Sequence, residues 1–76
     1  RIALVQMTAS DDPAANLAQV QDGVAQAIAG GAQFVLTPEC TNLLSLNRDY
    51  QRQVLLPESK DPTLSALRHQ AATAGI

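Results

Sequence analysis

Apolar residues in this chain gather in two short runs that flank an amphipathic stretch. The run from Ile2 to Met7 is nearly continuous, which favours a strand buried on both faces. The run from Gln33 to Thr37 is rich in β-forming residues and predicts a second strand. Helical spacing between them is kept by Leu17, Val20, Val24 and Ile28. A strand, a helix and a second strand in this order predict two parallel strands of one sheet.

Turn-forming and capping residues mark the ends of the helices. Asp12 before Pro13 is typical of a helix start, because the carboxylate accepts hydrogen bonds from free backbone N–H groups and proline needs no partner. Gly30-Gly31 predicts the end of that helix. Asp61-Pro62 repeats the start signal, and Gly75 ends a final helix. We expect the buried stripe of that helix to consist of Leu64, Leu67, Ala71 and Ala74.

The segment between the second strand and the final helix is less regular. Residues 40–47 form a connection longer than usual, and such loops are often functional. Asn47 can cap a short helix over Arg48 to Val54. Because Leu46, Tyr50 and Val54 are spaced by four, we expect Tyr50 to pack against the other two.

The order of elements predicts an α/β fold, and the composition indicates that this fold needs further strands and helices to be stable. Hydrophobic residues make up 46% of the 76 residues but aromatic residues only 3%, so the apolar area is small for an independent core. The chain has a single cysteine and a single histidine, so neither a disulfide nor a structural metal can compensate. Two parallel strands do not form a stable sheet alone. We therefore expect the chain to be the opening βαβα segment of a larger α/β domain.

Charge and motifs exclude several function classes. The formal net charge is −2 and the basic residues are scattered, which argues against a nucleic-acid partner. No apolar run is long enough for a membrane span, and no secretory leader pattern is present. The unpaired cysteine agrees with a reducing, cytoplasmic location. No glycine-rich nucleotide loop or metal-ligand set occurs, so we expect no cofactor.

Glu39 is the leading candidate for chemistry. Ligands of open parallel α/β sheets bind beyond the carboxyl ends of the strands, and Glu39 follows the second predicted strand. Pro38 stiffens the backbone immediately before it, as catalytic geometry requires. From position alone, a solvated loop glutamate is the commoner role.

Three other reactive side chains have simpler explanations. We expect Cys40 to be a small buried or half-buried thiol, because neighbours in an extended segment point to opposite sides. Lys60 lies in a connector beside Asp61, and we expect its charged side chain to be exposed to solvent. His69 projects away from the apolar stripe of the final helix and should be exposed.

An ordered set of short motifs spans essentially the whole chain. It comprises Val5-Gln6-Met7, Asn16-Leu17, Gly31-Ala32, Phe34 to Glu39, Glu58-Ser59 and Asp61 to Leu64. In order and spacing this set resembles the start of the nitrilase-like carbon–nitrogen hydrolases. The resemblance implies a four-layer αββα sandwich, of which residues 1–76 would be the N-terminal part of a single domain. It also implies a homo-oligomeric full-length protein with a small-molecule amide as substrate.

The resemblance assigns a role to Glu39. The family uses a glutamate, a lysine and a cysteine, and only the glutamate maps onto this sequence. Glu39 would take the proton of the cysteine thiol, pass it to the leaving amine and later activate water. The lysine and the nucleophile would lie beyond Ile76, so residues 1–76 alone should be inactive.

The residues around Glu39 bear on the branch of the family. The sequence from Pro38 to Asn42 is closer to the amidase branches, ω-amidase-like or deaminated-glutathione-amidase-like, than to true nitrilases. The family often has an aromatic residue shortly after the glutamate, whereas this chain has Thr41, Leu43 and Leu44.

Two non-catalytic readings compete with the hydrolase. Asp11-Asp12 after the first strand is similar to the acidic pair of receiver domains, which hold magnesium with a third carboxylate. The pair also fits a helix cap before Pro13, which we favour. A hydrolase-like subunit that lacks the nucleophile is the other alternative.

Overall fold

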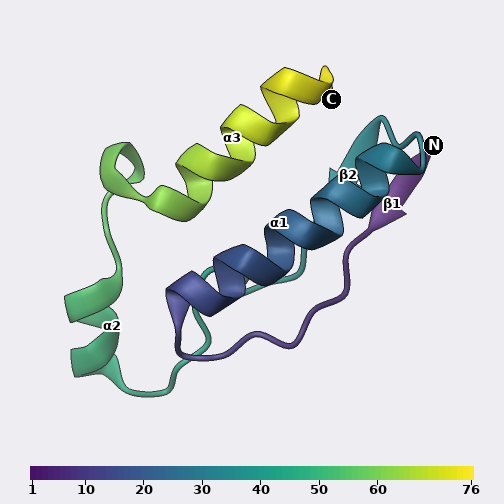
Figure 1. Cartoon of the computed structure of the whole chain (residues 1–76). Helices are drawn as coiled ribbons and strands as arrows, with labels where there is room; N and C mark the ends of the chain where they lie inside the picture. Colours follow the sequence, from purple (N-terminus) through teal and green to yellow (C-terminus); the bar gives the residue numbers. More distant parts are fainter.

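The computed structural model describes all 76 residues, and its elements follow the predicted order. In chain order the longest helix stands between the two strands, which lie side by side near one end of that helix, and two further α-helices follow the second strand (Figure 1). The elements are β1 (Ile2–Leu4), α1 (Pro13–Ala29), β2 (Phe34–Leu36), α2 (Arg48–Val54), a 3-10 helix η1 (Glu58–Lys60) and α3 (Pro62–Ala74). Only η1 was not expected from the sequence.

Helix α1 begins and ends where its local signals predict. Asp12 Oδ1 accepts hydrogen bonds from the backbone N–H groups of Ala14 and Ala15, at 3.1 and 3.3 Å. The left-handed residue after the helix is Gly31, with φ 84°, whereas Gly30 keeps a negative φ of −80°. Val20 and Val24 are buried, so the predicted apolar stripe is the side that packs.

The two strands pair in parallel, as the order of elements predicts. Ile2 lies opposite Phe34, and Leu4 lies opposite Leu36. One further backbone hydrogen bond, from Val5 N to Leu36 O at 2.9 Å, continues the ladder past the end of β1. Each strand is three residues long, shorter than the apolar runs from which it was predicted.

The prediction that the first strand is buried on both faces is wrong for this structure. Ile2 and Leu4 are 74% and 75% exposed, and their partners Phe34 and Leu36 are also exposed. Ala3, between them, is half-buried, because successive side chains of a strand point to opposite faces. One face of the sheet therefore meets the helices, and the other is an uncovered apolar face formed by Ile2, Leu4, Phe34 and Leu36.

Helix α3 lies beside α1 (Figure 1). Asp61 Oδ1 caps its start by accepting from Thr63 N at 2.9 Å, and Gly75 ends it in the left-handed region at φ 71°. Gln70 Nε2 donates to Gln21 O of α1 at 3.0 Å. Of the predicted stripe, Leu64, Leu67 and Ala71 are only half-buried, and Ala74 is exposed.

Helix α2 has the predicted bounds but different contacts. Asn47 Oδ1 accepts from Tyr50 N at 3.0 Å, as expected for its cap. The expectation that Tyr50 packs on Leu46 is wrong, because Leu46 is 99% exposed. The Tyr50 hydroxyl instead donates to the carbonyl oxygen of Asp11, which joins α2 to the loop before α1.

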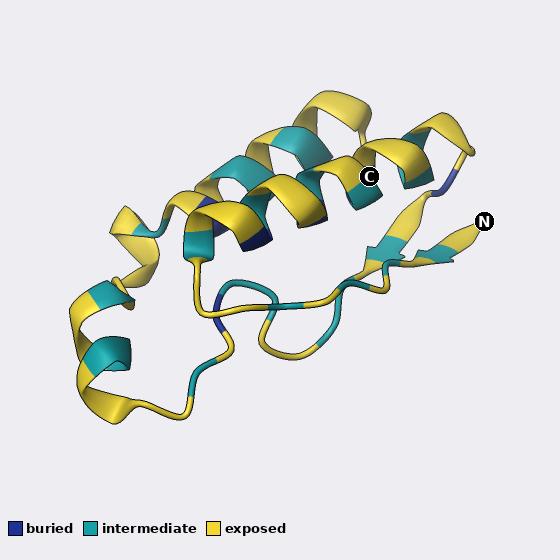
Figure 2. Cartoon of the chain, turned by 60° about the horizontal axis from the view of Figure 1, so that its bottom comes forward, coloured by how far each residue is buried: buried dark blue, intermediate teal, exposed yellow.

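The chain forms an open, elongated layer. Its radius of gyration is 12.8 Å and its extents are 40 × 24 × 15 Å. A compact domain of this length would have a radius of gyration of about 11 Å. Buried positions are few and lie on α1, at the start of α3 and in the segments that flank β2 (Figure 2). None of the helices is both long enough and apolar enough to cross a membrane.

Candidate active site

Glu39 lies in a tight turn just beyond the carboxyl end of β2. Thr37 and Pro38 lead out of the strand, and the turn covers Glu39 and Cys40. The Thr41 hydroxyl donates a hydrogen bond back to the carbonyl oxygen of Pro38, which closes the turn. The Glu39 side chain is exposed and takes no part in the two ion pairs of the chain, Arg52–Asp49 and Arg68–Glu58. Its carboxylate therefore projects from a closed turn, with its hydrogen-bonding capacity free.

The prediction that Cys40 is a buried or half-buried thiol is wrong. Cys40 is exposed, and its φ of 59° makes it the only non-glycine residue with a left-handed backbone. That conformation costs roughly 1–2 kcal/mol for a residue with a Cβ. The segment is a turn, so the alternation of an extended chain does not apply to the pair Glu39-Cys40.

Asn16, in the first turns of α1, connects the Glu39 turn to the rest of the chain. Its side chain is 1% exposed. Asn16 Nδ2 donates to Ser10 O at 2.8 Å and to Asn42 O at 3.0 Å. Asn16 Oδ1 accepts from Ser10 N at 2.8 Å and from Ser10 Oγ at 3.2 Å. One buried amide thus holds the loop after β1 and the loop after β2 together.

Other bonds fix the same two loops. Leu44 N donates to Ser10 O at 3.0 Å, and the preceding residue, Leu43, is buried. Gln19, one turn after Asn16, accepts from Thr8 N at 2.7 Å and donates to Thr8 O at 3.1 Å. The backbone groups of the loops beyond the carboxyl ends of both strands are therefore bonded to side chains of α1 and to each other, at the edge where parallel sheets bind ligands.

The sequence reasoning did not single out Asn16 as a functional residue, although a signal was present. Asn16, Val20 and Val24 are spaced by four and all three are buried. A polar residue in register with the apolar stripe of a helix must find hydrogen-bond partners inside the fold. That register could have drawn attention to Asn16.

The remaining candidates belong to other elements than the Glu39 turn. Lys60 is exposed in η1 and His69 is exposed on α3, as predicted for both. Asp12 is a helix cap, which confirms the capping interpretation of the Asp11-Asp12 pair. The receiver-like alternative needs three acidic side chains around one ion, but no group of three potential metal ligands occurs.

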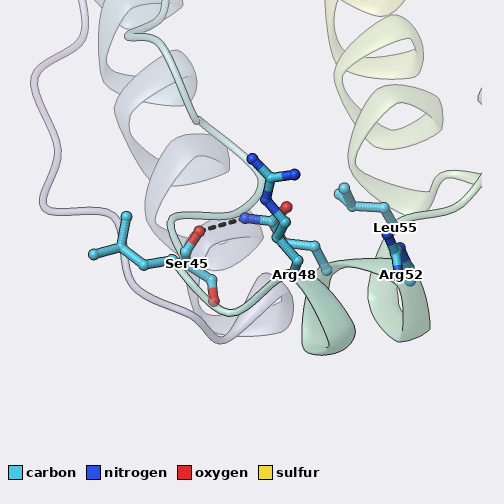
Figure 3. Close-up of a pocket in the computed structure, with 6 residues that line it drawn as sticks. Ser45, Arg48, Arg52 and Leu55 are labelled. Atoms are coloured by element: carbon cyan, nitrogen blue, oxygen red, sulfur yellow. Dashed lines mark hydrogen bonds between the residues drawn. The ribbon is translucent and has the colours of Figure 1, made fainter.

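A separate hollow lies beside α2. It is lined by Ser45, Leu46, Arg48, Gln51, Arg52 and Leu55. Gln51 Nε2 donates to Ser45 O, a bond drawn as a dashed line in Figure 3. Neither Glu39 nor Cys40 lines this hollow, so it is not part of the Glu39 turn.

The comparison with protein families decides what kind of chain this is. A model of the family described as carbon–nitrogen hydrolase matches residues 1–76. The chain belongs to the carbon–nitrogen hydrolase family. Neither a curated protein nor a solved structure matches it.

Membership in the carbon–nitrogen hydrolase family agrees with the fold. The two-stranded parallel sheet and its helices fit an α/β fold, and the family implies the nitrilase-like architecture. The function is therefore of the carbon–nitrogen hydrolase type. The family match also overturns the receiver-domain hypothesis, because it covers the whole chain.

Proposed function

We propose that this carbon–nitrogen hydrolase chain is the N-terminal part of an amidohydrolase that cleaves the C–N bond of a small, non-peptide amide. Glu39 is its general base. The observation that carries the proposal is the position of Glu39, beyond the end of β2 on a turn closed by Thr41 and Pro38, in a chain of this family. The lysine and the cysteine of the Glu-Lys-Cys set come from residues outside this chain.

The chemistry needs a carboxylate that can both accept and donate a proton. Glu39 removes the proton of the cysteine thiol, and the thiolate attacks the amide carbon while the lysine stabilises the oxyanion. Glu39 then gives that proton to the leaving amine as the C–N bond of the tetrahedral intermediate breaks, which leaves the thioester acyl-enzyme. In the second half-reaction Glu39 takes a proton from water and the hydroxide attacks the thioester. The C–S bond then breaks to release the carboxylic acid, and Glu39 returns the proton to the cysteine thiolate.

Two features of the chain support a larger domain around Glu39. Glu39 is exposed here, whereas a proton-shuttling carboxylate works best in a site from which water is excluded. Ile2, Leu4, Phe34 and Leu36 form an uncovered apolar face. A second layer packed on that face, as in the four-layer αββα sandwich, would bury the four residues.

The amidase branch is proposed from the residues after Glu39. Thr41 is used to close the turn and Leu43 is buried beside α1, so neither takes the place of an aromatic pocket residue. Leu44, like Leu46, is an exposed apolar side chain of this segment. A small aliphatic contact of this kind suits the short acyl chain of an ω-amidase-like or deaminated-glutathione-amidase-like substrate. We place the full-length enzyme in the cytoplasm as a homo-oligomer.

The direct test is the reaction catalysed by the full-length protein. Purified enzyme is assayed for ammonia release from short primary amides that carry a distal carboxylate, with the corresponding nitriles as the matched control. We expect turnover of amides and none of nitriles. Nitrile turnover alone would move the enzyme to the nitrilase branch, and absence of any C–N hydrolysis would favour a subunit that lacks the nucleophile.

A further inference from the structure

We infer that Asn16 is a positioning residue for the Glu39 turn. The inference rests on the proposed role of Glu39 as general base, and it adds a residue to which no step of the reaction has been assigned. Asn16 is 1% exposed and makes four hydrogen bonds with its side-chain amide. All four go to the loops that follow β1 and β2.

The path from Asn16 to Glu39 is short and stiff. Asn16 Nδ2 holds Asn42 O at 3.0 Å, three residues after Glu39. Within the turn, the Thr41 hydroxyl donates to Pro38 O. Pro38 comes directly before Glu39, and its ring fixes the φ angle at the entry of the turn. The entry of the turn is thus tied to its exit, and the exit is tied to α1. Without Asn16, the exit keeps only the neighbouring Leu44 N to Ser10 O bond at 3.0 Å.

The chemistry of the Asn16 side chain suits this position. A buried amide is costly unless its donors and acceptor are satisfied. Asn16 Nδ2 donates to two carbonyl groups and Oδ1 accepts from a backbone N–H, so the planar amide matches a fixed arrangement of three backbone groups. An apolar residue would continue the stripe of Val20 and Val24 on α1 but would remove the side-chain partner of Ser10 N and Asn42 O, and would leave Ser10 O with Leu44 N alone.

Gln19 provides a matched comparison within the same helix. It also uses its side-chain amide to bond backbone groups of a loop, Thr8 N at 2.7 Å and Thr8 O at 3.1 Å. Both of its partners belong to the loop after β1, and neither belongs to the loop that carries Glu39. Loss of Gln19 therefore loosens one loop, whereas loss of Asn16 leaves the two loops joined only by the Leu44 N to Ser10 O bond.

The test is a double-mutant cycle in the full-length enzyme, with kcat and KM measured for the amide substrate. Asn16→Ala should lower kcat by about 100-fold with a smaller change in KM, since a misplacement of about 1 Å costs that much. Gln19→Ala should stay within about 5-fold of wild type. In a Glu39→Asp background, Asn16→Ala should add less than about 3-fold, because both changes act on the same carboxylate.

If Asn16→Ala does not fold, a substitution inside the turn still tests whether the geometry of the turn affects kcat. Thr41→Val removes the bond to Pro38 O without changing the shape of the side chain, and we expect a kcat loss of about 10-fold that Thr41→Ser restores. Melting temperatures of all variants identify losses caused by unfolding.

The outcomes separate this inference from the proposed function. If Glu39→Gln, which removes the carboxylate, retains wild-type kcat, the role of Glu39 as general base is wrong. If Glu39→Asp is impaired but the Asn16→Ala and Glu39→Asp losses multiply in full, Asn16 supports the fold only and the positioning role is rejected. The same holds if Asn16→Ala behaves like Gln19→Ala.

Discussion

Gly23 of α1 lies directly against Val5, the residue that follows β1. A Cβ placed on Gly23 would come within 2.7 Å of Val5 Cγ1, closer than van der Waals contact allows. The atom is part of a β-branched side chain, which has little rotamer freedom with which to move away. The first strand segment therefore approaches α1 at a point where the helix has no side chain.

This contact predicts the effect of Gly23→Ala. Alanine in a helix interior normally stabilises by roughly 0.5–1 kcal/mol relative to glycine. Here we expect a net loss of about 1–3 kcal/mol in the free energy of unfolding, because Val5 must shift. Chemical denaturation of the full-length enzyme measures it.

Gly30→Ala is the matched control for that substitution. A Cβ on Gly30 would meet its nearest atoms at 3.5 Å, an ordinary contact, and its φ of −80° suits any residue. We expect a change within about 0.5 kcal/mol. Equal effects of the two substitutions would mean that the close approach to Val5 is not present in solution.

The cap of α1 predicts a second stability effect. Asp12→Ala removes the acceptor for Ala14 N and Ala15 N, and we expect a loss of about 1 kcal/mol in the free energy of unfolding. Asp12→Asn keeps an acceptor and should lose less. Asp11→Ala is the control, because Asp11 contributes its backbone carbonyl to Tyr50 and its side chain caps nothing. A larger loss for Asp11→Ala than for Asp12→Ala would contradict this assignment.

Helix boundaries were predictable because their causes are local. Asp12, Asn47 and Asp61 cap the N–H groups two or three residues ahead, and that geometry depends only on the adjoining sequence. The parallel pairing followed from the order of elements, since a crossover through a helix brings the second strand back in the same direction.

What the sequence did not reveal depends on contacts between distant segments. A continuous apolar run does not say whether both faces of a strand are covered, and Ile2 and Leu4 are exposed here. The left-handed turn at Cys40 carries no glycine signal. Asn16 became visible as part of the site only when Ser10 and Asn42, 32 positions apart in sequence numbering, were brought to the same amide.

The uncovered sheet face predicts that two substitutions at exposed residues differ strongly in their effect on the free energy of unfolding. Leu4 is 75% exposed on the sheet and Ala25 is exposed on α1. If a second layer covers the sheet in the full-length enzyme, Leu4→Glu should lose about 3 kcal/mol or more, because it buries an unpaired charge. Ala25→Glu should stay within about 0.5 kcal/mol.

Denaturation of the two full-length variants checks the sandwich architecture. A near-neutral Leu4→Glu would show that the face formed by Ile2, Leu4, Phe34 and Leu36 stays open to water. Such a result would contradict a four-layer arrangement around this sheet, and it would leave the assignment of Glu39 to be judged separately.

The central claim is that Glu39 is the general base, and the most direct measurement is the turnover of Glu39→Gln beside Cys40→Ser. Both residues are exposed in the same turn, so the pair controls for disturbance of the loop. We predict that Glu39→Gln lowers amide hydrolysis by at least about 100-fold with an unchanged melting temperature, since general acid–base catalysis contributes that much or more. Cys40→Ser should remain near wild type, because the nucleophile lies elsewhere. Wild-type turnover by Glu39→Gln, or loss of turnover confined to Cys40→Ser, would contradict the account.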